Sequence, residues 1–222
     1  MKNNVNYQQI LDKKLVEITE SGQVPSLLLH ACCAPCSSYC LEYLTNYFHI
    51  TIFYYNPNIT FKDEFDKRVN ELSRLLTELS CKYPVDLIVG EYHPEEFIAA
   101  VKGMETLPEG GERCYHCYEL RLRETAKLCR EQGFDYYTTT LSISPHKRAD
   151  WLNEIGGRLA DEYDLNYLYS DFKKRNGYKR SIELSQEYHL YRQDYCGCVY
   201  SRRDNHNHAQ KIENDIGLCR SV

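Results

Sequence analysis

The sequence lacks any long run of apolar residues, since its longest such runs are only a few residues. A membrane-spanning helix needs about 20 consecutive apolar residues, so the sequence predicts none. The first residues, MKNNVNYQQILDKKLVEITE, also lack the apolar stretch and the small-residue cleavage site of a secretory signal. Internal repeats and low-complexity segments are missing as well. We therefore expect a cytoplasmic protein with no membrane partner.

An excess of positive charge is missing too, because the formal net charge is -5. This balance argues weakly against a nucleic-acid partner until single segments are considered. Residues 173–180 carry five positive charges and no acid. The run is typical of a solvated loop, and it would also suit contacts with RNA phosphates. Otherwise the composition, with 42% hydrophobic and 27% charged residues, is that of a globular protein.

Helical and strand patterns alternate along the chain. We expect helices at 7–21, 37–48, 61–80, 94–102, 114–132 and 147–162, and strands at 26–31, 50–55, 85–89, 136–141 and 166–169. This order predicts an α/β fold with a Rossmann-like, doubly wound parallel sheet. Ligands of such sheets bind beyond the carboxyl ends of the strands. Cys32 and Cys33 directly follow the first strand, and Asn56 and Ser142 hold corresponding positions after two others.

What the sequence has in unusual number is cysteine. There are eleven, an odd number that a fully paired disulfide framework cannot use. Most of them form clusters: Cys32, Cys33, Cys36 and Cys40, then Cys114 and Cys117, then Cys196 and Cys198. In a reducing compartment such clusters bind metal or perform redox chemistry more often than they brace a fold.

Three interpretations of these cysteines stay open on spacing alone. Four thiolates from two pairs suit a cubane iron–sulfur cluster or a four-coordinate zinc, although adjacent Cys32 and Cys33 match a zinc knuckle poorly. A zinc site would favour a zinc-stabilised RNA-binding protein. The Cys33-Ala34-Pro35-Cys36 segment instead suggests a thioredoxin-like thiol–disulfide oxidoreductase, in which a helix N-terminus lowers a thiol pKa. Cys196-Gly197-Cys198 could close into a small, easily reduced disulfide ring, or could be two incidental thiols.

Six motifs occur in an order that is typical of one family. They are His30-Ala31-Cys32-Cys33-Ala34-Pro35-Cys36, Asn56-Pro57-Asn58-Ile59, Glu112-Arg113-Cys114-Tyr115-His116-Cys117-Tyr118, Thr138-Thr139-Thr140-Leu141-Ser142-Ile143-Ser144-Pro145, Ser170-Asp171-Phe172-Lys173-Lys174 and Tyr191-Arg192-Gln193-Asp194-Tyr195-Cys196-Gly197-Cys198. Over residues 26–202 the chain resembles the QueH family of epoxyqueuosine reductases.

The resemblance implies an oxidoreductase of tRNA processing that performs the last step of queuosine biosynthesis. Its substrate would be the tRNA anticodon arm carrying epoxyqueuosine, and it would need an electron donor that the sequence does not identify. It implies that Cys32, Cys33, Cys114 and Cys117 bind a [4Fe–4S] cluster and that Cys196 and Cys198 form a redox-active disulfide. Cys36 is a candidate ligand for one additional iron.

The resemblance further implies a sheet of the adenine nucleotide alpha-hydrolase type, followed by a mostly helical C-terminal segment. Because cysteines replace the Gly-rich pyrophosphate loop of that superfamily, we expect no ATP chemistry. We divide the chain into a helical extension (1–25), the α/β reductase-like domain (26–202) and a tail (203–222). By position, His30 and Asp171 are candidate proton donors, and residues 173–180 are candidates for contact with anticodon-arm phosphates.

Overall fold

The computed structural model describes residues 5–202, in which four parallel strands form one sheet. The strands are β1 (Ser26–His30), β2 (His49–Tyr54), β3 (Asp86–Val89) and β4 (Tyr136–Thr139), in the order β3-β2-β1-β4. In the central register Leu29 of β1 is opposite Ile52 of β2 on one side and Thr138 of β4 on the other. The predicted α/β class and parallel sheet are confirmed.

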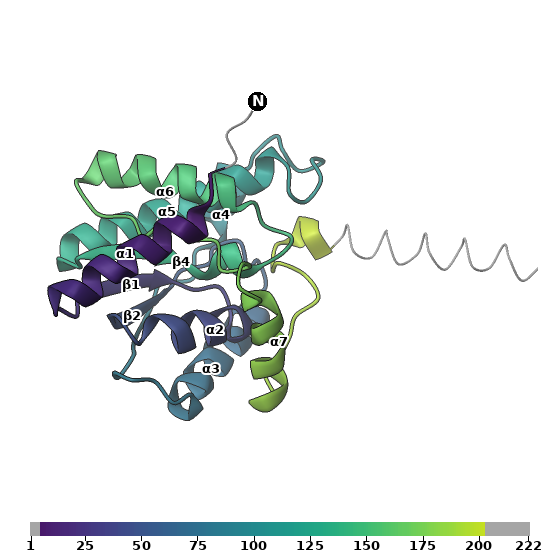
Figure 1. The fold of residues 1–222 in the computed structure, drawn as a ribbon. Coiled ribbons are helices and arrows are strands. Elements are labelled where there is room, and N and C mark those ends of the chain that lie inside the picture. Colours follow the sequence, from purple (N-terminus) through teal and green to yellow (C-terminus); the bar gives the residue numbers. More distant parts are fainter. Residues whose placement is uncertain (1–4, 203–222) are drawn as a thin grey trace, which may run out of the picture.

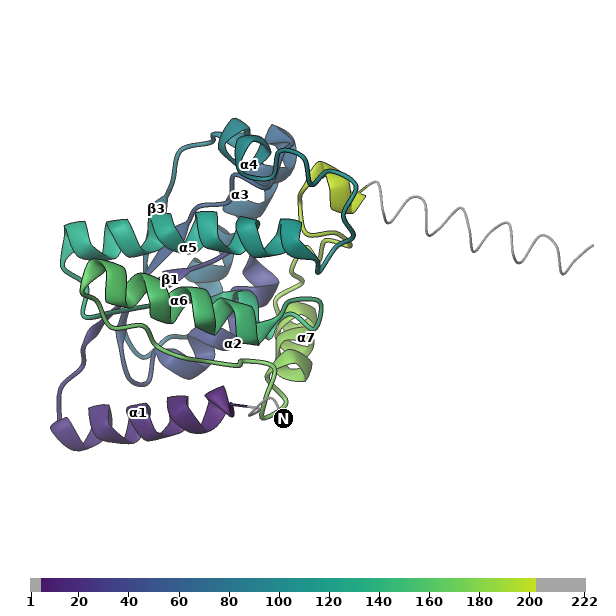
Figure 2. The same ribbon diagram turned by 90° about the horizontal axis from the view of Figure 1, so that it is seen from above.

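Helices cover both faces of this sheet (Figure 1 and Figure 2). One layer contains α1 (Tyr7–Ser21), α2 (Ala34–Leu44) and α3 (Lys62–Glu78), and the other contains α5 (Glu112–Gln132) and α6 (Ala149–Tyr163). The short α4 (Pro94–Ala100), the 3₁₀ turn η1 (Thr140–Ile143) and α7 (Gly177–Glu187) complete the fold, with α7 packed on α2. In the described part of the chain, no helix is both long and apolar enough to cross a membrane.

The central strand β1 is buried on both faces because its alternate side chains enter two different cores. Leu27 and Leu29 of β1 join the core under α1, α2 and α3. Leu28, between them, joins the core under α5 and α6. The continuous apolar run that predicted β1 therefore serves two layers at once.

Four segments differ from the sequence predictions. The strand expected at 136–141 ends at Thr139, where the 3₁₀ turn η1 follows. The strand expected at 166–169 is a single parallel bridge between Tyr167 and Tyr137. Helix α2 begins at Ala34 rather than at residue 37, because extended Cys33 is its N-cap and Pro35 fits its first turn. Helix α7 lies in the segment that was expected to be mostly helical, but its bounds were not predicted; it begins just after Asn176, which has the positive φ of 61°.

Candidate active site

Three cysteine thiols meet where β1 runs into α2. The Sγ atoms of Cys32, Cys33 and Cys36 all lie within 4.8 Å of one another, and those of Cys32 and Cys33 are 3.6 Å apart. Cys32 and Cys33 are buried, and Cys36 is partly exposed. We call these residues the strand thiols. Their grouping shows that this part of the chain could hold a metal centre.

The three strand thiols differ in acidity. Hydrogen bonds with Cys33 and Cys36 hold the pKa of the Cys32 thiol well below its ordinary value, although burial opposes this. The hydrogen bond with Cys32 raises the pKa of the Cys33 thiol to about 11. Hydrogen bonds with Cys32 and Cys33 raise the pKa of Cys36 well above its ordinary value. A single negative charge on the group therefore resides on Cys32.

A second set of thiols comes from α5 and from the C-terminal segment. Cys114 and Cys117 lie one turn apart in α5, where the Gly110 N–H donates a hydrogen bond to the Cys114 sulfur at 3.3 Å. Cys117 packs in a small cluster with Cys198, and Cys196 lies against the same cluster. Burial raises the pKa of Cys117 to about 11.

The Cys196 and Cys198 sulfurs lie 3.5 Å apart as two thiols. The hydrogen bond with Cys198 lowers the pKa of Cys196 to about 6, whereas the pKa of Cys198 is raised. The Ser201 N–H donates to the Cys198 sulfur at 3.3 Å. At neutral pH this pair therefore consists of one thiolate and one thiol.

Arg68 of α3 fixes the backbone that carries this pair. Its buried guanidinium donates to the Cys196 carbonyl at 3.1 Å and to the Tyr195 carbonyl at 3.3 Å. Glu64, one turn earlier in α3, pairs with the same guanidinium at 2.7 Å. Glu64 and the two carbonyl groups thus hold the Arg68 guanidinium in place beside the cavity.

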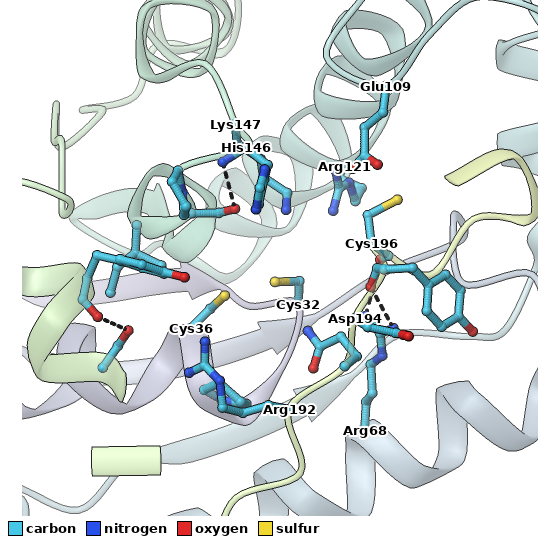
Figure 3. Close-up of a pocket in the computed structure, with 18 residues that line it drawn as sticks. Cys32, Cys36, Arg68, Glu109, Arg121, His146, Lys147, Arg192, Asp194 and Cys196 are labelled. Atoms are coloured by element: carbon cyan, nitrogen blue, oxygen red, sulfur yellow. Dashed lines mark hydrogen bonds between the residues drawn. The ribbon is translucent and has the colours of Figure 1, made fainter. Parts of the chain in front are cut away.

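A cavity of about 300 Å³ lies between the two sets of thiols (Figure 3). Cys32 and Cys36 line it from one side and Cys196 from another. Its other lining residues come mainly from the segment after β4, from α7 and from the segment that follows α7; they include Arg121, His146, Lys147, Tyr178, Ser181, Arg192 and Asp194. The cavity thus joins thiols that are far apart in the sequence.

Two cations next to the thiols were not predicted from the sequence. Arg121 of α5 is only 2% exposed, and its Nε donates to the Cys117 carbonyl at 3.1 Å. Burial works against the charged forms of Arg121 and Lys147, yet thiolates close to each, including Cys32 for both, raise both pKa values. The spacing of Arg121, four residues after Cys117 and so on the same helix face, was a signal that could have revealed it.

The structure brings together only part of the predicted ligand set. Cys32 and Cys33 share their group with Cys36, whereas Cys114 and Cys117 lie outside that group. Cys114 packs against the apolar core that contains Cys32 and Cys33. The predicted pairing of Cys196 with Cys198 agrees with their contact distance. Cys219 and the histidines of the tail lie outside the described residues.

Neither candidate proton donor lines the cavity. His30 is fully buried, and burial lowers its pKa to about 3. Its Nε2 donates to the Tyr55 carbonyl at 3.0 Å, so Nδ1 is the acceptor for the Thr139 hydroxyl at 2.8 Å. Asp171 pairs with Lys173 at 3.0 Å. His30 is thus a neutral core residue, and Asp171 is engaged in the fold.

Known proteins are similar to this chain over most of its length. The sequence model of the family described as "Epoxyqueuosine reductase QueH" matches residues 27–204. A relative of that name from Streptococcus pyogenes is 43% identical over 202 residues, which cover 90% of this chain and 79% of the relative. A Staphylococcus epidermidis relative is 43% identical, covering 90% and 87%, and one from Thermotoga maritima is 35% identical, covering 82% and 94%.

Proposed function

This chain belongs to the QueH family of epoxyqueuosine reductases, and we propose that its reaction takes place in the cavity between Cys32, Cys36 and Cys196. The chain is an oxidoreductase that reduces the epoxide of epoxyqueuosine in tRNA to give queuosine. Both C–O bonds of the epoxide break, a C=C bond forms, and the oxygen leaves as water after taking up two electrons and two protons. The observation that carries the placement is the convergence of thiols from distant segments on one cavity.

We further propose that Cys32, Cys33, Cys114 and Cys117 bind a [4Fe–4S] cluster. The donor set suits such a cluster, because four cysteine thiolates are its usual ligands. The cluster with its four thiolates would carry a net negative charge, which nearby cations must balance. Arg121 and Lys147 are those cations, and a buried guanidinium such as Arg121 itself needs anionic neighbours. The cluster would supply electrons singly and could polarise the epoxide oxygen.

Cys36 faces the cavity beside these residues, and it is the candidate ligand for one additional iron. Its thiol is within 4.8 Å of the Cys32 sulfur, so a metal bound there would adjoin the cluster. Metal analysis of the reconstituted protein tests this assignment. Four irons per chain in both wild type and Cys36→Ala would exclude the additional iron, whereas loss of a fifth iron in the variant supports it.

Cys196 and Cys198 are the proposed source of the electron pair. Oxidation of the Cys196 thiolate and the Cys198 thiol to a disulfide releases two electrons and one proton. The epoxide requires both electrons, and the second proton of the water comes from solvent. The Cys196 thiolate is the reactive member, since its pKa of about 6 leaves it deprotonated at neutral pH. An external electron donor must then reduce the disulfide again.

The activity is tested by incubating the anaerobically reconstituted protein with tRNA that carries epoxyqueuosine and analysing the released nucleosides by mass spectrometry. Formation of queuosine is expected. Replacement of Cys32, Cys33, Cys114 or Cys117 by Ala should remove iron, sulfide and visible absorption. Cys129→Ala is the matched control, because Cys129 is buried away from the cavity. This variant protein should keep its cluster. A ligand variant that keeps full iron and sulfide would refute the assignment of that residue.

The role of the Cys196 pair is tested by counting thiols before and after one turnover without added reductant. The proposal expects two thiols to disappear for each queuosine formed. Cys198→Ser should keep the cluster and bind tRNA, yet fail to turn over with a thiol donor. Product formed while both thiols stay reduced would leave the pair as a structural element.

A thioredoxin-like mechanism at Cys33 and Cys36 is not favoured. Such a mechanism needs an acidic, accessible thiol at the helix N-terminus. Here Cys33 is 1% exposed and its pKa is raised, while the acidic thiol is Cys32 outside that pair. A purely RNA-binding role is not favoured either, since the relatives are named as reductases.

A further inference from the structure

Positive side chains without carboxylate partners gather around the cavity. Arg121, Lys147 and Arg192 all line it, and within residues 5–202 none of the three forms an ion pair with a carboxylate. The hydrogen bond of the Arg192 guanidinium goes to the neutral Ser185 hydroxyl at 3.0 Å. The cavity is lined by the cations Arg68, Arg121, Lys147 and Arg192 and by the carboxylates Glu109 and Asp194. The chain as a whole has a net charge of -5, so this excess of positive charge is local.

The basic run at 173–180 presents the opposite situation. Arg175 pairs with Asp12 at 2.6 Å, and Arg180 pairs with Glu42 at 2.6 Å. Lys173 and Lys179 also have acidic partners, at 3.0 Å and 3.9 Å, so four of the five charges are compensated within the fold. The run therefore offers RNA much less charge than its sequence indicates.

The positions of Lys147 and Arg192 suit a ligand that enters from outside. Lys147 is half-buried on the segment between η1 and α6, and Arg192 is exposed on the segment after α7. Figure 3 shows Cys32 and Cys36 between His146 and Lys147 on one side and Arg192 on the other. Arg121 lies deeper, beside the thiols, where its charge is needed for them.

The geometry points to Lys147 and Arg192 as the residues that hold the phosphates flanking the target nucleotide. This inference rests on the proposed function and adds the part of the substrate that the cavity mouth recognises. Enzymes that act on a base take it out of the stack into a pocket, which leaves its phosphates at the rim. The cavity volume of about 300 Å³ is at the small end for ligand pockets and suits one base rather than a stretch of RNA.

Phosphate contacts make binding depend on salt, because each contact releases counterions. We expect Lys147→Gln and Arg192→Gln each to weaken tRNA binding and to lower the slope of log K against log salt by about one. Lys82→Gln is the matched control, since Lys82 is exposed and precedes β3, at the end of the sheet opposite the cavity. It should leave the slope unchanged. Lys147→Arg and Arg192→Lys preserve the charge and should restore it.

Each variant is first checked for its cluster absorption and thermal melting, so that a change in slope reports on binding and not on folding. If Lys147→Gln and Arg192→Gln keep the wild-type slope, or if Lys82→Gln lowers it equally, the assignment is wrong. Failure of the proposed function would look different. In that case the wild-type protein would bind tRNA, and the slope of log K against log salt would fall in Lys147→Gln and Arg192→Gln. The wild-type protein would nevertheless form no queuosine.

Discussion

At the scale of single residues, Gly197 fixes how Cys196 and Cys198 approach each other. Its φ of 113° lies in a region that other residues rarely adopt, and its carbonyl accepts a hydrogen bond from the Thr60 N–H at 3.3 Å. A Cβ at this position would lie 2.8 Å from the Ile59 Cγ1 atom. Backbone conformation and lack of space thus require glycine at the same residue.

Gly197→Ala should therefore destabilise the protein by about 1–3 kcal/mol and separate the two thiols. Urea unfolding measures the first effect. The rate at which a mild oxidant closes the Cys196–Cys198 disulfide measures the second, and it should fall. Gly103→Ala is a useful control, because Gly103 also has a positive φ but nothing lies within 4 Å of its Cβ position. That control should lose stability without any change in the oxidation rate.

At the scale of elements, α3 holds the segment that leads to Cys196. Glu64, Arg68, Glu71 and Arg74 lie along one face of this helix, and each contacts residues 188–196. Glu71 accepts the Tyr191 N–H at 2.6 Å and pairs with Arg74 at 2.8 Å. A helix whose apolar side enters the core thus uses its charged side to place the segment that carries Cys196.

Glu71→Gln is expected to cost about 1–3 kcal/mol at pH 7, since it removes a charged acceptor from a backbone N–H. Arg74 holds the pKa of Glu71 below its ordinary value, so the carboxylate stabilises the folded state above the unfolded pKa. This contribution is lost as the pH falls through the lowered folded pKa. The stability difference between wild type and variant should therefore shrink below about pH 4.5.

Urea titrations at pH 7 and at lower pH measure this difference. Glu78→Gln is the matched control, because Glu78 pairs with the same Arg74 but is 41% exposed. An exposed pair of this kind contributes about 1 kcal/mol or less. Equal losses for both variants, or a loss for Glu71→Gln that does not vary with pH, would contradict the role assigned to Glu71.

Local sequence patterns predicted most helices and strands, but they did not predict which side chains contact one another in the fold. A continuous apolar run predicted β1, because a strand buried on both faces has no polar side. The cysteine spacing identified the thiols, but Cys36 joined Cys32 and Cys33 because α2 begins at Ala34. The run at 173–180 was misleading, since its partners Asp12 and Glu42 lie far away in the sequence. Spacing carries no information about contacts of that range.

At the scale of the whole molecule, α1 belongs to the central core although the family model begins only at residue 27. Leu11, Leu15 and Ile18 are buried with the side chains of β1, α2 and α3. The ion pair of Asp12 with Arg175 connects the same helix to the segment before α7. The division of the chain into residues 1–25 and 26–202 stays a prediction, although α1 packs in the same core as the sheet.

Leu15→Ala should lower the free energy of unfolding by about 2–5 kcal/mol, because Leu15 is 4% exposed. The loss should be global. Trp151, the only tryptophan, lies on α6 in the opposite layer, so its fluorescence and the far-UV circular dichroism should report the same transition. Val16→Ala, at a neighbouring residue that is 54% exposed, should change stability by less than about 0.5 kcal/mol. An early loss of helix signal before any change at Trp151 would show that α1 unfolds independently.

The distance in sequence between the walls of the cavity also sets the order in which a cell builds it. Cys32 and Cys36 are made early, whereas Cys196 follows Cys117 by about 80 residues. At about 5–20 residues per second, a ribosome needs about 4–16 seconds to synthesise that interval. During this time the nascent chain carries all four proposed cluster ligands but lacks the wall that encloses them. Metal delivered before translation ends would meet an open site. The proposed metal centre would be shielded from oxygen only after the segment that carries Cys196 has been synthesised and has folded over the cavity.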